Sequence, residues 1–170
     1  AGNIDYEKTE ALVRRYFGGL ETRSVTLSTP SGEIYKPAVV TCSKDIEQQH
    51  MCIAFKGITR FDSDIYTMHV LNTILGGSMS SLLFQHIREE KGLAYSIYSV
   101  HSPYENTGLF TVYAGFGRDK TDIVKETILN ELFTFADTFG DEDLLNGAKQ
   151  QLINGFLMSL ENTSQVMGAT

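Results

Sequence analysis

The sequence of 170 residues contains no tryptophan, only three prolines and only two cysteines. Two cysteines are too few for the disulfide framework that stabilises small secreted domains, so the fold must depend on a hydrophobic core. No run of eighteen apolar residues is present, which argues against a membrane-spanning helix and membrane partners. The first residues also lack the pattern of a secretory signal peptide. These absences predict a cytoplasmic protein.

The two cysteines, Cys42 and Cys52, lie in a stretch typical of two strands joined by a turn near Ile46–Glu47. Such a hairpin would place the thiols nearly opposite each other, whereas a register shift of one residue would place them on different faces. We expect two reduced, half-buried thiols, which fits a reducing compartment.

Basic residues are in the minority, because 14 Lys and Arg stand against 21 Asp and Glu, for a net charge of -7. The sequence has no basic stripe that could meet phosphates, so we expect no nucleic-acid partner. An acidic surface suits cationic partners, and the charge therefore favours basic peptides as ligands.

Composition divides the chain into three parts. Residues 1–20 predict the end of a strand, a turn at Gly2–Asn3, and a helix that begins after Asp5 and stops at Gly18–Gly19. Residues 21–37 hold two of the three prolines and few bulky apolar groups, which is typical of a linker. So short an N-terminal piece cannot bury a core alone, and we expect it to be the end of a preceding domain.

Residues 38–170 predict an α+β domain with a mainly antiparallel sheet and helices packed on it, because strands and helices come in clusters. Both faces of the later strands are apolar enough for the middle of the sheet to be covered on both sides. Hydrophobic periodicity predicts strands at 38–44, 49–58, 94–104 and 108–117, and helices at 62–77, 78–92, 119–139 and 141–162.

Some boundaries of these elements are predicted as well. The first two helices of this domain are expected to be capped by Asp62 or Ser63 and by Ser78 or Ser80. The last two strands are expected to form a hairpin around Glu105–Asn106. After the last helix the chain stops without a closing strand, so we expect the domain to be truncated at its end.

None of the four histidines forms a recognisable zinc motif. The sequence contains neither H-E-x-x-H nor H-x-x-E-H, the two-histidine signatures of metallopeptidases. The stretch HIREE, from His86 to Glu90, has a glutamate at the position where the second imidazole must stand. Histidines inside helices or strands, as His50, His69 and His101 are predicted to be, are more often structural. We therefore predict no metal site in this sequence.

The same stretch contains two other side chains of interest. Arg88 lies in the last turn of its predicted helix, and Gly92 turns the chain so that Tyr95 opens the next strand. A guanidinium and a phenol that reach one rim of a sheet can donate hydrogen bonds to a carbonyl oxygen as it gains negative charge. The alternative is structural, because a cation stabilises the C-terminal end of a helix and tyrosine is common in strands.

The segment LGGSMSSLLFQHIREEKGLAYSIYS closely resembles the C-terminal domain of the insulinase/pitrilysin family of zinc peptidases, in the bacterial branch related to the mitochondrial processing peptidase. The resemblance covers nearly the whole chain in the family's order. It extends to GNIDYEKTEALVRRYFGGL, KDIEQQHMCIAFKGI and GDEDLLNGAKQQLINGFLMSLENTSQVMGA.

The resemblance implies a fold and a division of labour. A first domain carries H-x-x-E-H and the zinc, and a second domain without metal closes the chamber over an unfolded peptide. An arginine and a tyrosine seven positions apart in the second domain match Arg88 and Tyr95, which would stabilise the oxyanion of the scissile carbonyl. On this basis residues 1–20 are the end of the catalytic domain, 21–37 the linker, and 38–170 the chamber-closing domain.

The resemblance also implies partners and limits. Zinc is expected in the missing N-terminal domain, so the fragment alone should be inactive while the full-length protein is a zinc metalloendopeptidase. The expected partners are a peptide, the preceding domain, and a second subunit in a homo- or hetero-dimer. Two alternatives stay open: a non-catalytic scaffold or partner subunit of the same family, and a peptide-binding module without peptidase activity.

Overall fold

The protein is described here from a computed structural model, which covers residues 2–21 and 35–169. The chain forms two compact units. One comprises Ala1–Thr29 and Ile153–Thr170, and the other comprises Pro30–Leu152. None of the helices in the described ranges is long and apolar enough to cross a membrane.

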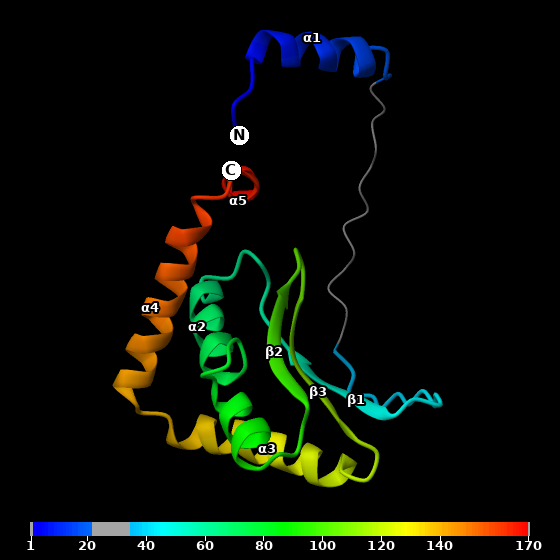
Figure 1. The fold of residues 1–170 in the computed structure, drawn as a ribbon, viewed down its shortest axis with the longest axis vertical. Coiled ribbons are helices and arrows are strands. Elements are labelled where there is room, and N and C mark those ends of the chain that lie inside the picture. Colours follow the sequence, from blue (N-terminus) through cyan, green and yellow to red (C-terminus); the bar gives the residue numbers. More distant parts are fainter. Residues whose placement is uncertain (1, 22–34, 170) are drawn as a thin grey trace. The chain divides into compact units, whose positions relative to one another are not determined.

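The larger unit is built on a three-stranded antiparallel sheet (Figure 1). Its strands are β1 (Gln48–Lys56), β2 (Ser96–Pro103) and β3 (Gly108–Gly117), in the order β1-β3-β2. The hairpin of β2 and β3 forms as predicted, and the N–H of Tyr104 donates to the C=O of Thr107 at its turn. The α+β class with an antiparallel sheet is thereby confirmed.

Helices pack on one face of this sheet. Here α2 (Ile65–Leu75) and η1 (Phe84–Glu90) contact β2, and α3 (Thr121–Thr138) contacts β3 and η1 (Figure 1). The inward residues of the strands alternate with outward ones, as a pleated strand requires. The fully buried members of this core are Leu83, Ile87, Val112, Ala114, Phe116, Val124 and Ile128.

The other face of the sheet is more open than predicted. The apolar alternation on β3 indicated cover on both faces, but Leu109 is exposed and Tyr113 is only partly buried. All the helices that contact the sheet share the face of Phe116 and Val112. Within the described residues the sheet is therefore half of a two-layer structure.

The remaining helices also follow the predicted spans. The carboxylate of Asp5 accepts the N–H of Lys8 at 3.1 Å and caps α1 (Tyr6–Phe17) as expected. Asp141 accepts the N–H of Leu144 at 3.0 Å and begins α4 (Glu142–Ser159). A short helix, α5 (Thr163–Ala169), follows where no element was predicted.

The predicted hairpin between residues 38–44 and 49–58 is wrong. Residues 35–46 form no strand, and β1 pairs instead with β3 along all nine of its residues. This pairing places Met51, Ile53 and Phe55 against the core, whereas Val39 and Val40 are about nine-tenths exposed. The half-buried thiols are also wrong, because both free cysteines are exposed.

Not every predicted boundary is confirmed. The predicted strand end before Gly2 and most of the expected linker, residues 22–34, lie outside the described residues. Asp64 rather than Asp62 or Ser63 is the N-cap of α2, although the Asp62 carboxylate accepts the N–H of Asp64. Neither Ser78 nor Ser80 caps the next helix, because its first turn begins with the C=O of Ser81.

Gly76 lies directly against β2, so a side chain there should destabilise the fold. Its C=O accepts the N–H of Ser99 at 3.0 Å, and an added Cβ would meet the nitrogen of Ser99 and lie 2.6 Å from Ser99 Oγ. We expect Gly76→Ala to lower the free energy of unfolding by about 1–3 kcal/mol.

Guanidinium unfolding of the full-length protein measures this loss. Gly147→Ala on α4 is the control, because no atom lies within 4 Å of the added Cβ and alanine favours a helix. Its stability should be unchanged or higher. Equal destabilisation by both substitutions would contradict the close contact between Gly76 and β2.

Candidate functional site

Arg88 lies in the last turn of η1, as the sequence predicted. Its guanidinium carbon stands 4.6 Å from the centroid of the Phe84 ring, and its Nε lies 3.8 Å from Glu89 Oε1. The second distance is too long for a hydrogen bond. The side chain is 42% exposed, so the aromatic ring positions the guanidinium while its donors still face outward.

The helix that carries Arg88 is a π-helix rather than the α-helix expected. The N–H of Lys91 donates to the C=O of His86 at 3.2 Å, a bond that spans five residues. Gly92 ends the helix with φ +56°, a conformation that glycine adopts at little cost. Short π-helices are rare and frequently occur at functional sites.

A carboxylate from another helix fixes η1 in place. Glu131 of α3 accepts a hydrogen bond from His86 Nδ1 at 2.8 Å and lies 3.6 Å from Lys91 Nζ. Beside them Ile87 is fully buried in the core. His86 therefore helps to anchor the segment that presents Arg88.

Metal ligands are not grouped in the part of the chain that the structure describes. No three side chains of His, Cys, Asp or Glu are arranged there so that they could hold an ion. His86 is bonded to Glu131, and His50 Nδ1 lies 2.7 Å from the hydroxyl of Tyr113. These residues do not fit a zinc ion, and we derive no chemical step through one.

Tyr95 lies at the entry to β2, in an irregular pairing. Its N–H donates to the C=O of Gly115 at 2.8 Å, although Ser96 is the register partner of Gly115. The bond lies just outside the regular ladder, which begins at Ser96. Tyr95 is 64% exposed, whereas Ala94 before it is buried.

The two predicted site residues therefore lie on neighbouring elements, since η1 packs against β2. Among the described residues no hydrogen bond, ion pair or ring contact joins Arg88 to Tyr95. Lys120 secures the turn between them by donating to the C=O of Gly92 at 3.2 Å. The action of both side chains on one ligand stays a prediction.

Sequence reasoning missed the residues that support this pair. Glu131 and Lys120 are distant in sequence, and no local motif marks them. Gly115 could have been noticed as a glycine inside a strand, which often marks a place where another group approaches the backbone closely.

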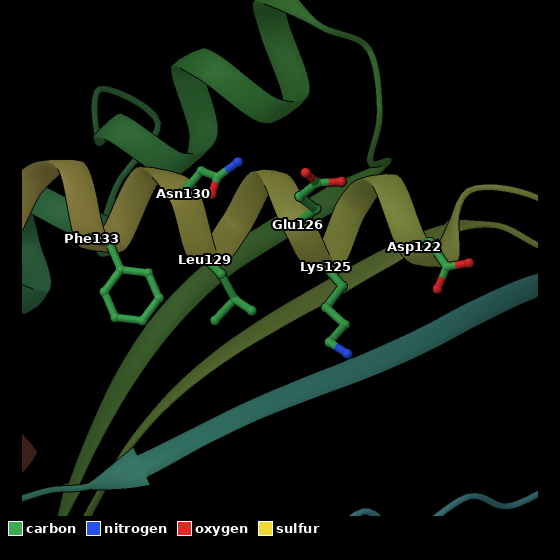
Figure 2. A pocket seen from close by; sticks show the side chains of 6 residues that line it. All are labelled: Asp122, Lys125, Glu126, Leu129, Asn130 and Phe133. Carbon is green, nitrogen blue, oxygen red and sulfur yellow. The ribbon is translucent and has the colours of Figure 1, made fainter.

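A shallow pocket lies along α3 and includes neither Arg88 nor Tyr95 in its lining (Figure 2). All its lining residues come from α3, and in Figure 2 Lys125, Leu129 and Phe133 point to one side of the helix whereas Glu126 and Asn130 point to the other. Charges of both signs and an exposed phenylalanine on one helix offer no convergent set of polar groups. We assign this pocket no function.

Helices on one face of an antiparallel sheet define a two-layer α+β domain. The chain matches the family described as the peptidase M16 inactive domain over residues 1–152, and it belongs to that family. This confirms the resemblance inferred from the sequence.

The relatives of the chain are longer proteins. A Bacillus subtilis (strain 168) protein named uncharacterized zinc protease YmxG is 39% identical over 167 residues, which cover 98% of this chain and 40% of that protein. A Rickettsia felis protein named uncharacterized zinc protease is 33% identical over 165 residues, which cover 96% of this chain and 39% of that protein. The chain thus spans about two fifths of the length of these relatives.

A solved structure shows the same fold. A protease from Helicobacter pylori aligns with a TM-score of 0.81 at 22% identity, over 98% of this chain and 42% of that one.

Proposed function

We propose that this chain is the substrate-binding, chamber-closing domain of a zinc metalloendopeptidase that hydrolyses peptide bonds in unfolded peptides. One observation carries the proposal: a member of the inactive-domain family exposes an arginine and a tyrosine on neighbouring elements, at the two positions that the sequence singled out. The zinc belongs to a preceding catalytic domain of the same protein. Relatives that are named zinc proteases support this assignment.

Arg88 and Tyr95 donate hydrogen bonds to the oxygen of the scissile carbonyl. When water attacks the carbonyl carbon, this oxygen becomes an oxyanion, and donors already in place stabilise it without reorganisation. The guanidinium has several N–H donors in a fixed planar arrangement. Two contacts support this role: the ring of Phe84 lies against the Arg88 guanidinium, and the N–H of Tyr95 donates to the C=O of Gly115.

The proposal extends to the setting of the enzyme. The acidic balance of the chain favours basic peptides, whose approach it would steer. We place the protein in the cytoplasm, alone or as a homo- or hetero-dimer.

Cleavage of a quenched fluorescent basic peptide by the full-length protein tests the proposal. We expect turnover that a chelator abolishes and added zinc restores. A scaffold or partner subunit would cleave nothing alone and would act only when mixed with a catalytic relative. A peptide-binding module would bind the peptide equally well with and without chelator. It would cleave nothing, whether alone or mixed with a catalytic relative.

A further inference from the structure

The outward face of the sheet has an unusual composition for so acidic a chain. Its positions are the even-numbered residues 50–56 of β1 and 96–102 of β2, and the odd-numbered residues 109–115 of β3, opposite the core residues. These positions include no Asp or Glu, and Lys56 is their one Lys or Arg, although the chain has a net charge of -7. We call this surface the open face.

Three rings, one from each strand, form a row across the open face. Tyr98 of β2 stacks on Tyr113 of β3 with 4.8 Å between ring centroids and 25° between ring planes. Tyr113 in turn stacks on His50 of β1 at 6.0 Å and 28°, and its hydroxyl lies 2.7 Å from His50 Nδ1. We call these three residues the aromatic row.

Gly115 keeps the surface beside the aromatic row clear. An added Cβ at this position would lie 3.3 Å from the Tyr113 hydroxyl and 2.8 Å from Ser96 Oγ. The absence of a side chain lets the Tyr113 hydroxyl approach the backbone there. The row is consequently accessible, with His50 exposed and Tyr98 47% exposed.

We propose that the aromatic row binds one bulky apolar side chain, aromatic or branched aliphatic, of the peptide substrate. This inference rests on the proposed function and names a determinant of its specificity. Tyr98 and His50 each have one ring face that Tyr113 does not cover, and against such a face or the edges of the row another side chain would gain burial and a favourable ring–ring geometry.

The charge of the open face selects apolar over basic side chains. A bound lysine or arginine side chain would find no carboxylate at the positions listed for this face, and it would lie on the same face as Lys56. The acidic residues that give the chain its net charge lie elsewhere and act on the peptide at longer range. A peptide that is basic as a whole can therefore also place one apolar side chain on the aromatic row.

The aromatic row lies close along the chain to the proposed oxyanion site. Tyr98 follows Tyr95 by three residues, so the two backbones are at most about 10 Å apart. An extended peptide covers the same distance in about three residues. The anchored side chain should accordingly lie about three residues from the scissile bond.

Peptides that differ at one position test this inference on the full-length protein. Two sets of four quenched fluorescent peptides would carry Phe, Leu, Lys or Ala about three residues from the cleaved bond, one set on each side of it. The dissociation constant is measured by fluorescence anisotropy on chelator-treated protein, and kcat and KM are measured on zinc-loaded protein. We expect the Phe and Leu peptides to bind more tightly than the Lys and Ala peptides at one of these positions.

Substitutions at Tyr98 test whether the aromatic row causes the preference for the Phe and Leu peptides. Tyr98→Ala should weaken binding of the Phe peptide about three- to tenfold and change binding of the Ala peptide much less. Tyr98→Phe retains the ring and should retain the preference. Tyr66→Ala, on the exposed side of α2, is the control and should behave as the wild type.

Two results would overturn the inference: equal affinity of the wild type for all four peptides in both sets, or an unchanged preference in Tyr98→Ala. A preference in binding without zinc-dependent cleavage would instead contradict the proposed peptidase activity and leave the aromatic row as a peptide anchor.

Discussion

Arg88→Ala and Tyr95→Phe are each expected to lower kcat of the full-length protein on a peptide substrate by about ten- to a thousandfold. Each substitution removes a hydrogen-bond donor that acts on the oxyanion, which exists only in the transition state. KM should therefore change little, because the ground-state peptide uses other contacts. Steady-state kinetics on a quenched fluorescent peptide, with zinc content determined on the same samples, measures both effects.

Control substitutions of the same residue types elsewhere test whether the loss of kcat is specific to Arg88 and Tyr95. The guanidinium of Arg60 also lies over a ring, 5.6 Å from the centroid of Phe61, so Arg60→Ala removes a similar pairing away from the site. Tyr66→Phe removes a hydroxyl from a tyrosine that is 79% exposed on α2. Both controls should retain wild-type kcat. Loss of zinc in parallel with kcat, or undiminished kcat in both site variants, would contradict the assigned roles.

Phe116→Ala should produce the largest loss of stability that we predict for this chain, about 3–5 kcal/mol. Phe116 is fully buried on β3 and belongs to the core that the sheet shares with the helices. The substitution removes its apolar contacts and leaves a cavity that neighbouring groups fill only in part. Guanidinium unfolding of the wild type and the variant measures the change in the free energy of unfolding, provided that both show the same dependence on denaturant concentration.

Phe133→Ala is the control for this prediction. Phe133 lies on α3 but is 62% exposed, so its removal should change stability by less than about 0.5 kcal/mol. Similar losses for the two phenylalanines would contradict the placement of the core on one face of the sheet.

The parts of the fold that depend on local sequence were predictable. The strands at 96–103 and 108–117 alternate clearly and are joined by a short turn, so their pairing follows from the sequence. The partner of β1 could not be predicted in this way. Residues 48–56 pair with a strand some sixty residues later, whereas residues 38–44 are close to them only in sequence. Alternation marks a strand but does not name its partner.

The candidate site divides in the same way. The positions of Arg88 and Tyr95 followed from a helix end, a glycine and a strand start, which are local signals. The π-helical pairing and the bond from His86 to Glu131 depend on tertiary packing between η1 and α3. No periodicity in the sequence distinguishes such a helix from an ordinary one.

The central claim is that Arg88 and Tyr95 stabilise a tetrahedral oxyanion, and a tetrahedral analogue tests it most directly. We would measure the inhibition constant of a phosphinic peptide against the full-length wild type, Arg88→Ala and Tyr95→Phe. Transition-state analogues gain the interactions that accelerate the reaction. We expect each substitution to weaken binding of the analogue by about the factor by which it lowers kcat/KM. Unchanged affinity for the analogue in variants that have lost activity would contradict the central claim.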